Sequence, residues 1–191
     1  MTSITVRLPD AEATRAYGRA LAAVLRAGDL VVLTGDLGAG KTTLTQGIGA
    51  GLQVRGQVAS PTFIIAREHP PLAREDGTRG PALVHVDAYR LGSLDEVDAL
   101  DLDSSLDEAV TVVEWGEGWV EALTSDRLEV TLQRPRGAHD PSGHDPSDPE
   151  SLAHDALDAA AGERTVTVRA VGDRWAGVAL PGDPDPVPVG G

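Results

Sequence analysis

The chain has 191 residues, of which 30 are acidic and 16 basic, so its formal net charge is −14. This acidic excess excludes broad non-specific binding of nucleic acid, because phosphate binding relies on clustered lysine and arginine. The sequence has no cysteine, which excludes disulfides and thiolate metal sites. It shows no signal-peptide pattern and no apolar run near the roughly 18 residues of a membrane span, so we expect a cytoplasmic protein without membrane contact.

The first part of the chain predicts strands and helices in alternation. Residues 4–10 alternate apolar and polar side chains, as a short strand does. A helix is predicted at about 11–27, with Gly28 as its C-terminal stop. Residues 29–35 form an apolar run typical of a strand buried on both faces. A second helix is predicted at 41–52 despite three glycines, whose small size would allow a neighbouring sheet to approach closely.

The second part predicts more strands. One lies within 60–69, one ends near Asp87 and a strongly β-branched one begins at 109, with one or two acidic helical turns expected at 93–108. Period-two alternation predicts antiparallel strands at one edge of the sheet, at 127–133, 164–172 and 174–180.

Two segments do not have the composition of a packed core. Residues 134–163 are rich in proline, glycine, aspartate and histidine, and we expect a mobile insert with a short helix at about 151–161. Residues 181–191 are too rich in proline to pack and are expected to be disordered. The remainder predicts a single domain over residues 1–180.

A glycine-rich turn lies between the predicted strand at 29–35 and the helix at 41–52. It matches the P-loop pattern GxxxxGK[ST], in which glycines with positive φ let backbone N–H groups close around phosphate oxygens. The helix N-terminus adds partial positive charge. The predicted nucleotide contacts in this turn are Gly35, Asp36, Leu37, Gly38, Ala39, Gly40, Lys41, Thr42 and Thr43.

Lys41 is the only lysine of the chain, since the other fifteen basic side chains are arginine. A planar guanidinium would crowd a phosphate cradle, whereas a compact ammonium can reach the β- and γ-phosphates. Guanine-specific GTPases read their base with an Asn-Lys-x-Asp element, which needs a second lysine. The expected nucleotide is therefore ATP.

Acidic residues follow two of the predicted strands and are candidates for holding Mg²⁺. Asp87 and Glu114 each come after an apolar run, and with the Thr42 hydroxyl they form the predicted metal site. Which of the two carboxylates ligates the metal directly is left open. Ser60 and Thr62, in the stretch SPTF, contact the γ-phosphate or Mg²⁺ in one interpretation and form a simple turn in the other.

Four motifs together resemble one family. GDLGAGKTTLTQG, SPTF, HVDAYRL and EWGE, in this order within residues 5–133, are similar to the TsaE family of bacterial P-loop ATPases. The resemblance implies an α/β fold, a P-loop NTPase-like three-layer sandwich with a mainly parallel central sheet and added antiparallel edge strands. It also implies Mg²⁺-dependent ATP hydrolysis that is weak in the isolated chain.

The family resemblance further implies partners and site residues. TsaE-like proteins act with TsaD and TsaB, which place threonylcarbamoyl on the adenosine beside the anticodon of tRNAs reading ANN codons. The chain would contact tRNA only indirectly, through that complex. By motif, the catalytic residues are Lys41, Asp87, Glu114 and Trp115, the last being the family's tryptophan beside the nucleotide site.

Two other functions fit a P-loop. A small-molecule kinase is the main alternative, but its expected arginine-rich lid would have to be the segment 134–163, which is dominated by acids and histidines. A nucleotide-binding scaffold that never hydrolyses ATP is the second. No arginine finger is identified from the sequence, so weak, partner-dependent activity is expected. The oligomeric state is left open, and a monomer is compatible with the sequence.

Overall fold

A computed structural model of the chain describes residues 2–59, 66–90, 107–118, 120, 123–134 and 162–182. The strands are β1 (Thr2–Leu8), β2 (Leu30–Thr34), β3 (Ala66–His69), β4 (Ala82–Asp87), β5 (Ala109–Glu114), β6 (Arg127–Gln133) and β7 (Arg164–Val171). The helices are α1 (Ala11–Ala22) and α2 (Lys41–Leu52), with short 3₁₀ turns η1 (Ala88–Arg90) and η2 (Asp173–Trp175). The helical turns expected at 93–108 and 151–161 lie outside the described residues, as do most of the insert and the tail.

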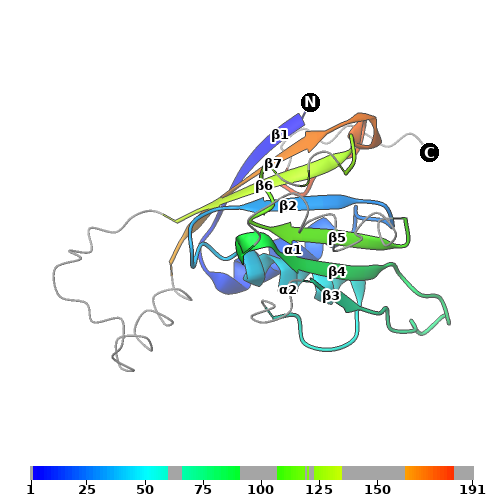
Figure 1. Cartoon of the computed structure of the whole chain (residues 1–191). Coiled ribbons are helices and arrows are strands. Elements are labelled where there is room, and N and C mark those ends of the chain that lie inside the picture. Colours follow the sequence, from blue (N-terminus) through cyan, green and yellow to red (C-terminus); the bar gives the residue numbers. More distant parts are fainter. Residues whose placement is uncertain are drawn as a thin grey trace, which may run out of the picture.

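All seven strands form one sheet in the order β1-β7-β6-β2-β5-β4-β3 (Figure 1). The central strands β6, β2, β5 and β4 pair in parallel, while β3 joins β4, and β7 and β1 join β6, in antiparallel fashion. Every residue of β5 is buried, as expected of a parallel strand covered on both faces. The predicted α/β fold with a parallel centre and antiparallel edges is confirmed.

Helices α1 and α2 cover one face of this sheet (Figure 1). Their apolar side chains form a single large cluster with residues from β1, β2, β4, β5, β6 and β7. The other face carries a smaller cluster around β2, β4 and β5, against which Val120 and Leu123 pack. Among the described residues, no helix has the length and hydrophobicity that crossing a bilayer requires.

The glycines of α2 allow it to press against α1. A Cβ on Gly47 would lie 2.2 Å from the carbonyl oxygen of Arg15, and one on Gly51 would lie 2.5 Å from Cβ of Ala22. Of the three glycines, only Gly49 faces the sheet, where a Cβ would be 3.3 Å from Leu83 of β4. The sequence predicted that the sheet would approach these glycines closely. This prediction is wrong for Gly47 and Gly51, which lie against α1 instead.

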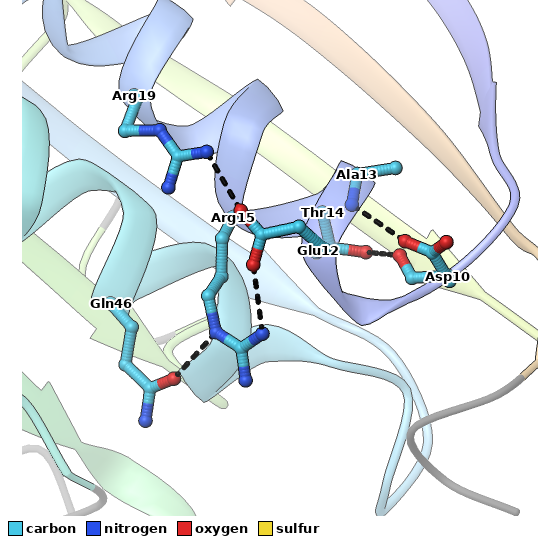
Figure 2. Close-up of polar contacts among 7 residues, drawn as sticks. All are labelled: Asp10, Glu12, Ala13, Thr14, Arg15, Arg19 and Gln46. Carbon is cyan, nitrogen blue, oxygen red and sulfur yellow. Dashed lines mark hydrogen bonds and ion pairs between the residues drawn. The ribbon is translucent and has the colours of Figure 1, made fainter.

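Polar contacts fix the start of α1 and tie it to α2 (Figure 2). Asp10 caps the helix as predicted, since its side chain accepts a 2.7 Å hydrogen bond from the N–H of Ala13. Glu12 accepts from Arg15 on the next turn, and Nε of Arg15 donates to Gln46 of α2 at 3.4 Å. The N-terminal part of α1 is thereby held against the helix that follows the glycine-rich turn.

Two expected elements differ from those observed. Helix α1 ends at Ala22 rather than near residue 27, and residues 174–180 form no strand but begin within the 3₁₀ turn η2. Arg174 explains both. Its guanidinium donates to both carboxylate oxygens of Asp29 and to the carbonyl of Val24, which fixes the turn after α1. These contacts join residues about 150 positions apart, so the local pattern contained no sign of them.

Candidate active site

The turn between β2 and α2 has the conformation of a phosphate-binding loop. Gly35, Gly38 and Gly40 all have positive φ, at 141°, 75° and 105°. A Cβ on Gly35 would lie 2.3 Å from the carbonyl oxygen of Leu132, so any larger residue would collide with β6. Because the turn leads into the first turn of α2, its N–H groups and the helix dipole act on the same space.

Lys41 is only 4% exposed and lies across this turn. Its Nζ donates to the carbonyls of Gly35 and Asp36 at 2.8 and 3.0 Å and lies 3.8 Å from the ring centroid of Trp115. Burial lowers the pKa of Lys41, and the charges of Glu114, Asp87 and Asp36 oppose this shift. The ammonium is therefore held between the phosphate loop and the predicted acidic residues.

Glu114, the last residue of β5, is 3% exposed and contacts two other buried groups. The Thr42 hydroxyl donates to its carboxylate at 2.9 and 3.2 Å, and Nε2 of His85 lies 2.9 Å from Oε1. The nitrogen that faces a carboxylate is the one that donates, so the proton of His85 belongs on Nε2. Glu114 is thus fixed from the α2 side by Thr42 and from the β4 side by His85.

Asp87 and Trp115 complete the carboxyl ends of β4 and β5. Asp87 lies beside Glu114 in the parallel register, and it accepts from the N–H of Tyr89 at 3.1 Å. Trp115 has φ 62°, a left-handed conformation that costs a bulky residue about 1–3 kcal/mol. Its backbone N–H donates to the carbonyl of Leu33 in β2 at 3.0 Å, which ties the backbone of this residue to β2, and its indole ring lies beside Lys41.

A pocket of about 300 Å³ opens between these groups. It is lined by Leu37, Gly38, Gly40, Lys41, Thr42, Thr43, Asp87, Glu114, Trp115 and Arg164. Most of the predicted site residues therefore surround one space, and Gly35 and Asp36 contact Lys41 next to it. Ser60 and Thr62 lie outside the described residues.

The oxygen donors in this pocket suit a hard cation. Hydroxyl and carboxylate oxygens are the ligands that Mg²⁺ takes in proteins, usually together with substrate phosphates and water. Thr42 and Glu114 supply such oxygens in direct contact, with Asp87 on the adjacent strand. Within the described ranges, no group of three or more histidine, aspartate or glutamate side chains is arranged to hold a metal ion, so phosphate oxygens and water would have to complete the coordination. The site fits Mg²⁺ bound with a phosphate chain.

Two residues of the site were not predicted from the sequence. His85 and Glu114 lie on the face of their strands that is turned toward the helices. The sequence indicated this only through the position of His85 two residues before Asp87, which puts both side chains on the same face of the strand. Arg164 begins β7 and enters the pocket from the other side of β2. It sits in an ordinary alternating stretch that gave no indication of a site.

The family model described as threonylcarbamoyl adenosine biosynthesis protein TsaE matches residues 8–140. The chain belongs to the TsaE family. A Streptomyces coelicolor protein named tRNA threonylcarbamoyladenosine biosynthesis protein TsaE is 55% identical over 163 residues, covering 85% of this chain and 93% of the relative. The protein of the same name from Bacillus subtilis is 34% identical over 176 residues, covering 92% and 90%.

A solved structure resembles the fold described above. The crystal structure of Bacillus subtilis YdiB superposes with a TM-score of 0.59 at 31% sequence identity, covering 92% of this chain and 90% of that one. The TsaE assignment predicted from the four motifs is therefore confirmed, and it places the chain in a family of tRNA threonylcarbamoyladenosine biosynthesis.

Proposed function

We propose that this TsaE-family chain is a Mg²⁺-dependent P-loop ATPase that works with TsaB and TsaD in placing threonylcarbamoyl on tRNA. The observation that carries the proposal is the contact between the Thr42 hydroxyl and the Glu114 carboxylate, with the Lys41 ammonium held beside them. A hydroxyl at the start of a helix, a buried acid at a strand end and a phosphate-loop lysine are the parts that ATP hydrolysis requires.

In this mechanism water attacks the γ-phosphate in line with the departing ADP. Lys41 and the N–H groups of the glycine-rich turn stabilise the negative charge that develops on the phosphate oxygens. When bound next to Thr42, Asp87 and Glu114, Mg²⁺ would supply positive charge that offsets the charge of the phosphate oxygens. Thr42 supplies an oxygen ligand for it, while Asp87 and Glu114 order the metal and the attacking water.

His85 keeps the acid of this mechanism in place. It is fully buried and lies 2.9 Å from Glu114, so the carboxylate cannot turn away from Thr42 without breaking that contact. The glutamate is thereby oriented toward the phosphate loop before a substrate arrives, which is how preorganised sites lower a barrier.

The role within a larger assembly is supported by the family. The relatives are named for tRNA threonylcarbamoyladenosine biosynthesis, and the net charge of −14 makes direct binding of tRNA by this acidic chain unfavourable. We therefore assign the tRNA contact to the partners and the ATP-driven step to this chain, with low turnover in isolation.

The decisive experiment is Glu114→Ala, assayed for ATP hydrolysis with and without TsaB and TsaD. We expect hydrolysis to fall about 100-fold or more, as when one charge-stabilising group of an active site is removed. Glu117→Ala, an exposed acid three residues further along, is the matched control and should hydrolyse ATP normally. Unchanged hydrolysis in Glu114→Ala would refute the mechanism, and failure to pull down TsaB and TsaD with or without ATP would refute the assignment of partners.

A further inference from the structure

Two buried histidines of the sheet each have one ring nitrogen without a hydrogen-bond partner among the described residues. They are His85 of β4, which is 0% exposed, and His69 of β3, which is 2% exposed. The nitrogens are Nδ1 of His85 and Nε2 of His69. Burying a polar atom without a partner is costly, so two such atoms in one part of the core call for an explanation. The proposed mechanism uses His85 but gives no part to His69.

The pairing of the strands places His69 and His85 on the same face of the sheet. His69 lies opposite Leu83 in the β3–β4 register, and Leu83 precedes His85 by two residues on the side that faces the helices. Glu114 lies opposite Asp87, two residues after His85. His85 therefore stands between Glu114 on one diagonal and His69 on the other. Diagonal neighbours in a sheet are within reach of aromatic and long side chains.

The contacts of each ring fix which of its nitrogens carries the proton. Nε2 of His85 lies 2.9 Å from the Glu114 carboxylate and donates to it, so Nδ1 of the neutral ring is an acceptor. Nδ1 of His69 lies 3.3 Å from the carbonyl oxygen of Arg55. Because a carbonyl only accepts, Nδ1 of His69 is the donor and its Nε2 is the acceptor. Both unpartnered nitrogens are therefore acceptors, and they cannot hydrogen-bond to each other directly.

The surroundings of His69 favour its neutral form. Burial lowers the pKa of His69, the carbonyl of Arg55 opposes this shift, and the charges of Arg67 and His85 add to it. The influence of His85 on this pKa also indicates that the two rings are near each other. A neutral His69 keeps the lone pair on Nε2 that its hydrogen bond to Arg55 requires.

The segment that follows α2 holds His69 in place. The N–H of Arg55 donates to the carbonyl of Pro70 at 2.8 Å, and the N–H of Leu72 donates to the carbonyl of Gln53 at 2.8 Å. The backbone around Arg55 is thus bound to the backbone that directly follows His69. A ring anchored in this way can restrain a neighbouring group, as the outer partners of metal ligands do.

We propose that His69 is a positioning residue of the candidate ATPase site and holds His85 through a water molecule that donates to both unpartnered nitrogens. A water has two O–H donors, and buried waters join polar groups that lack other partners. The shared water would keep the proton of His85 on Nε2, the nitrogen that donates to Glu114. Resting on the proposed ATPase function, this extends the support of the acid from β5 through β4 to β3.

The first test observes the rings directly, by NMR of the full chain labelled with ¹⁵N in its histidines. The chain has five histidines, and the signal lost in each single variant assigns His69 and His85. We expect the proton on Nε2 in His85 and on Nδ1 in His69, and a shifted His85 Nδ1 signal in His69→Leu because its donor is lost. A proton on Nδ1 of His85, or the same Nδ1 signal in His69→Leu and the wild type, would overturn the proposal.

The second test measures kcat and KM for ATP with Mg²⁺, in the presence of TsaB and TsaD. His69→Leu removes both ring nitrogens, and His69→Asn keeps a donor for the Arg55 carbonyl but has no acceptor at the place of Nε2. We expect kcat to fall about 3- to 10-fold in both, less than for a group that orients a metal ligand directly, with KM little changed. His69→Gln can put an acceptor oxygen near the place of Nε2 and should recover most of the loss. Glu68→Gln, on the exposed neighbour in the same strand, is the matched control and should hydrolyse ATP normally.

An equal loss of kcat in all three variants at position 69, His69→Gln included, would show that the ring only fills the core and would overturn the proposal. Wild-type kcat in a folded His69→Asn protein would overturn it as well. Failure of the proposed function looks different, because the wild-type chain would then not hydrolyse ATP at all, while the ring signals of His69 and His85 would still report on the shared water. The melting temperature of each variant establishes that folded protein is compared.

Discussion

The two sides of β2 are built differently. On the β5–β4 side the strands are parallel and almost wholly buried, and they end in Glu114 and Asp87. On the β6–β7–β1 side β6 is still parallel to β2, but β7 and β1 are added in antiparallel fashion, and these strands have one apolar face against the helices and one polar face. On that polar face Glu129 pairs with Arg127 and Arg169. Acids end the first set of strands, whereas a buried arginine begins β7 at the same pocket.

This difference places acids and a buried arginine on opposite sides of the phosphate loop. Parallel strands bring several carboxyl ends to one edge of the sheet, so acidic residues from neighbouring strands converge there. Antiparallel strands bring the start of β7 to that same edge, and with it Arg164. We therefore expect substitutions on the parallel side to act mainly on hydrolysis, and those on the antiparallel side to act mainly on binding and stability.

The largest effect on stability is expected from Arg174→Met, at the far end of the antiparallel side. Asp29 is 3% exposed and receives two hydrogen bonds of 2.9 and 3.0 Å from Arg174, so the variant leaves a buried carboxylate without its cation. We expect a loss of about 3–5 kcal/mol in the free energy of unfolding, measured in urea. ATP hydrolysis by the protein that remains folded should be normal.

The double variant Asp29→Asn/Arg174→Met is the control for this prediction. It removes the uncompensated charge together with its partner, so it should be more stable than Arg174→Met alone. If the single and double variants are equally unstable, the loss comes from packing on Trp175, whose ring lies 4.4 Å from the guanidinium carbon of Arg174, and not from the buried charge.

A smaller effect, on hydrolysis, is expected from His85→Leu on the parallel side. The variant removes the 2.9 Å contact that orients Glu114, while Thr42 still holds the carboxylate from the other side. We expect kcat to fall about 10-fold or more, as for groups that orient metal ligands, with little change in KM for ATP. Steady-state kinetics and a thermal melt measure both.

The conservative variant His85→Gln distinguishes positioning from packing. Glutamine can place an N–H near the position of Nε2, so it should recover most of the lost kcat, which leucine cannot. Equal activity of His85→Leu and the wild type would mean that Glu114 keeps its orientation without the histidine.

The smallest effect is expected from Glu129→Gln. This glutamate bridges Arg127 and Arg169 at 2.7 and 2.8 Å, but its side chain is 27% exposed and that of Arg169 is 48% exposed. Ion pairs in contact with solvent contribute little, so unfolding free energy should change by less than about 1 kcal/mol. A loss as large as that of Arg174→Met would contradict the distinction between buried and exposed pairs on this side.

The parts of the structure that depend on local pattern were predictable. Apolar runs predicted β2 and β5, the glycines and Lys41 predicted the phosphate loop, and Asp10 predicted the start of α1. Each rests on neighbours in the sequence. The end of α1 was not predictable in this way, because Arg174 fixes the turn that follows it from far along the chain.

The site shows the same division. Asp87 and Glu114 end apolar runs and could be recognised individually, and the register of β4 and β5 brings them side by side. Arg164 resembles any arginine in an alternating strand, and its place in the pocket depends on β7 reaching the phosphate loop through β6. Sequence pattern thus indicates the residues that follow a strand, but not a side chain delivered by a strand from elsewhere in the sheet.

The glycine contacts between α1 and α2 also bear on how the molecule opens. A Cβ on Gly18 would lie 2.4 Å from the carbonyl oxygen of Leu44, and one on Gly47 would lie 2.2 Å from that of Arg15, so neither helix can tilt without pushing on the other's backbone. Local unfolding proceeds in cooperative units. The helix that begins with Lys41 and the helix capped by Asp10 therefore form one such unit, and their amide hydrogens should exchange with solvent together.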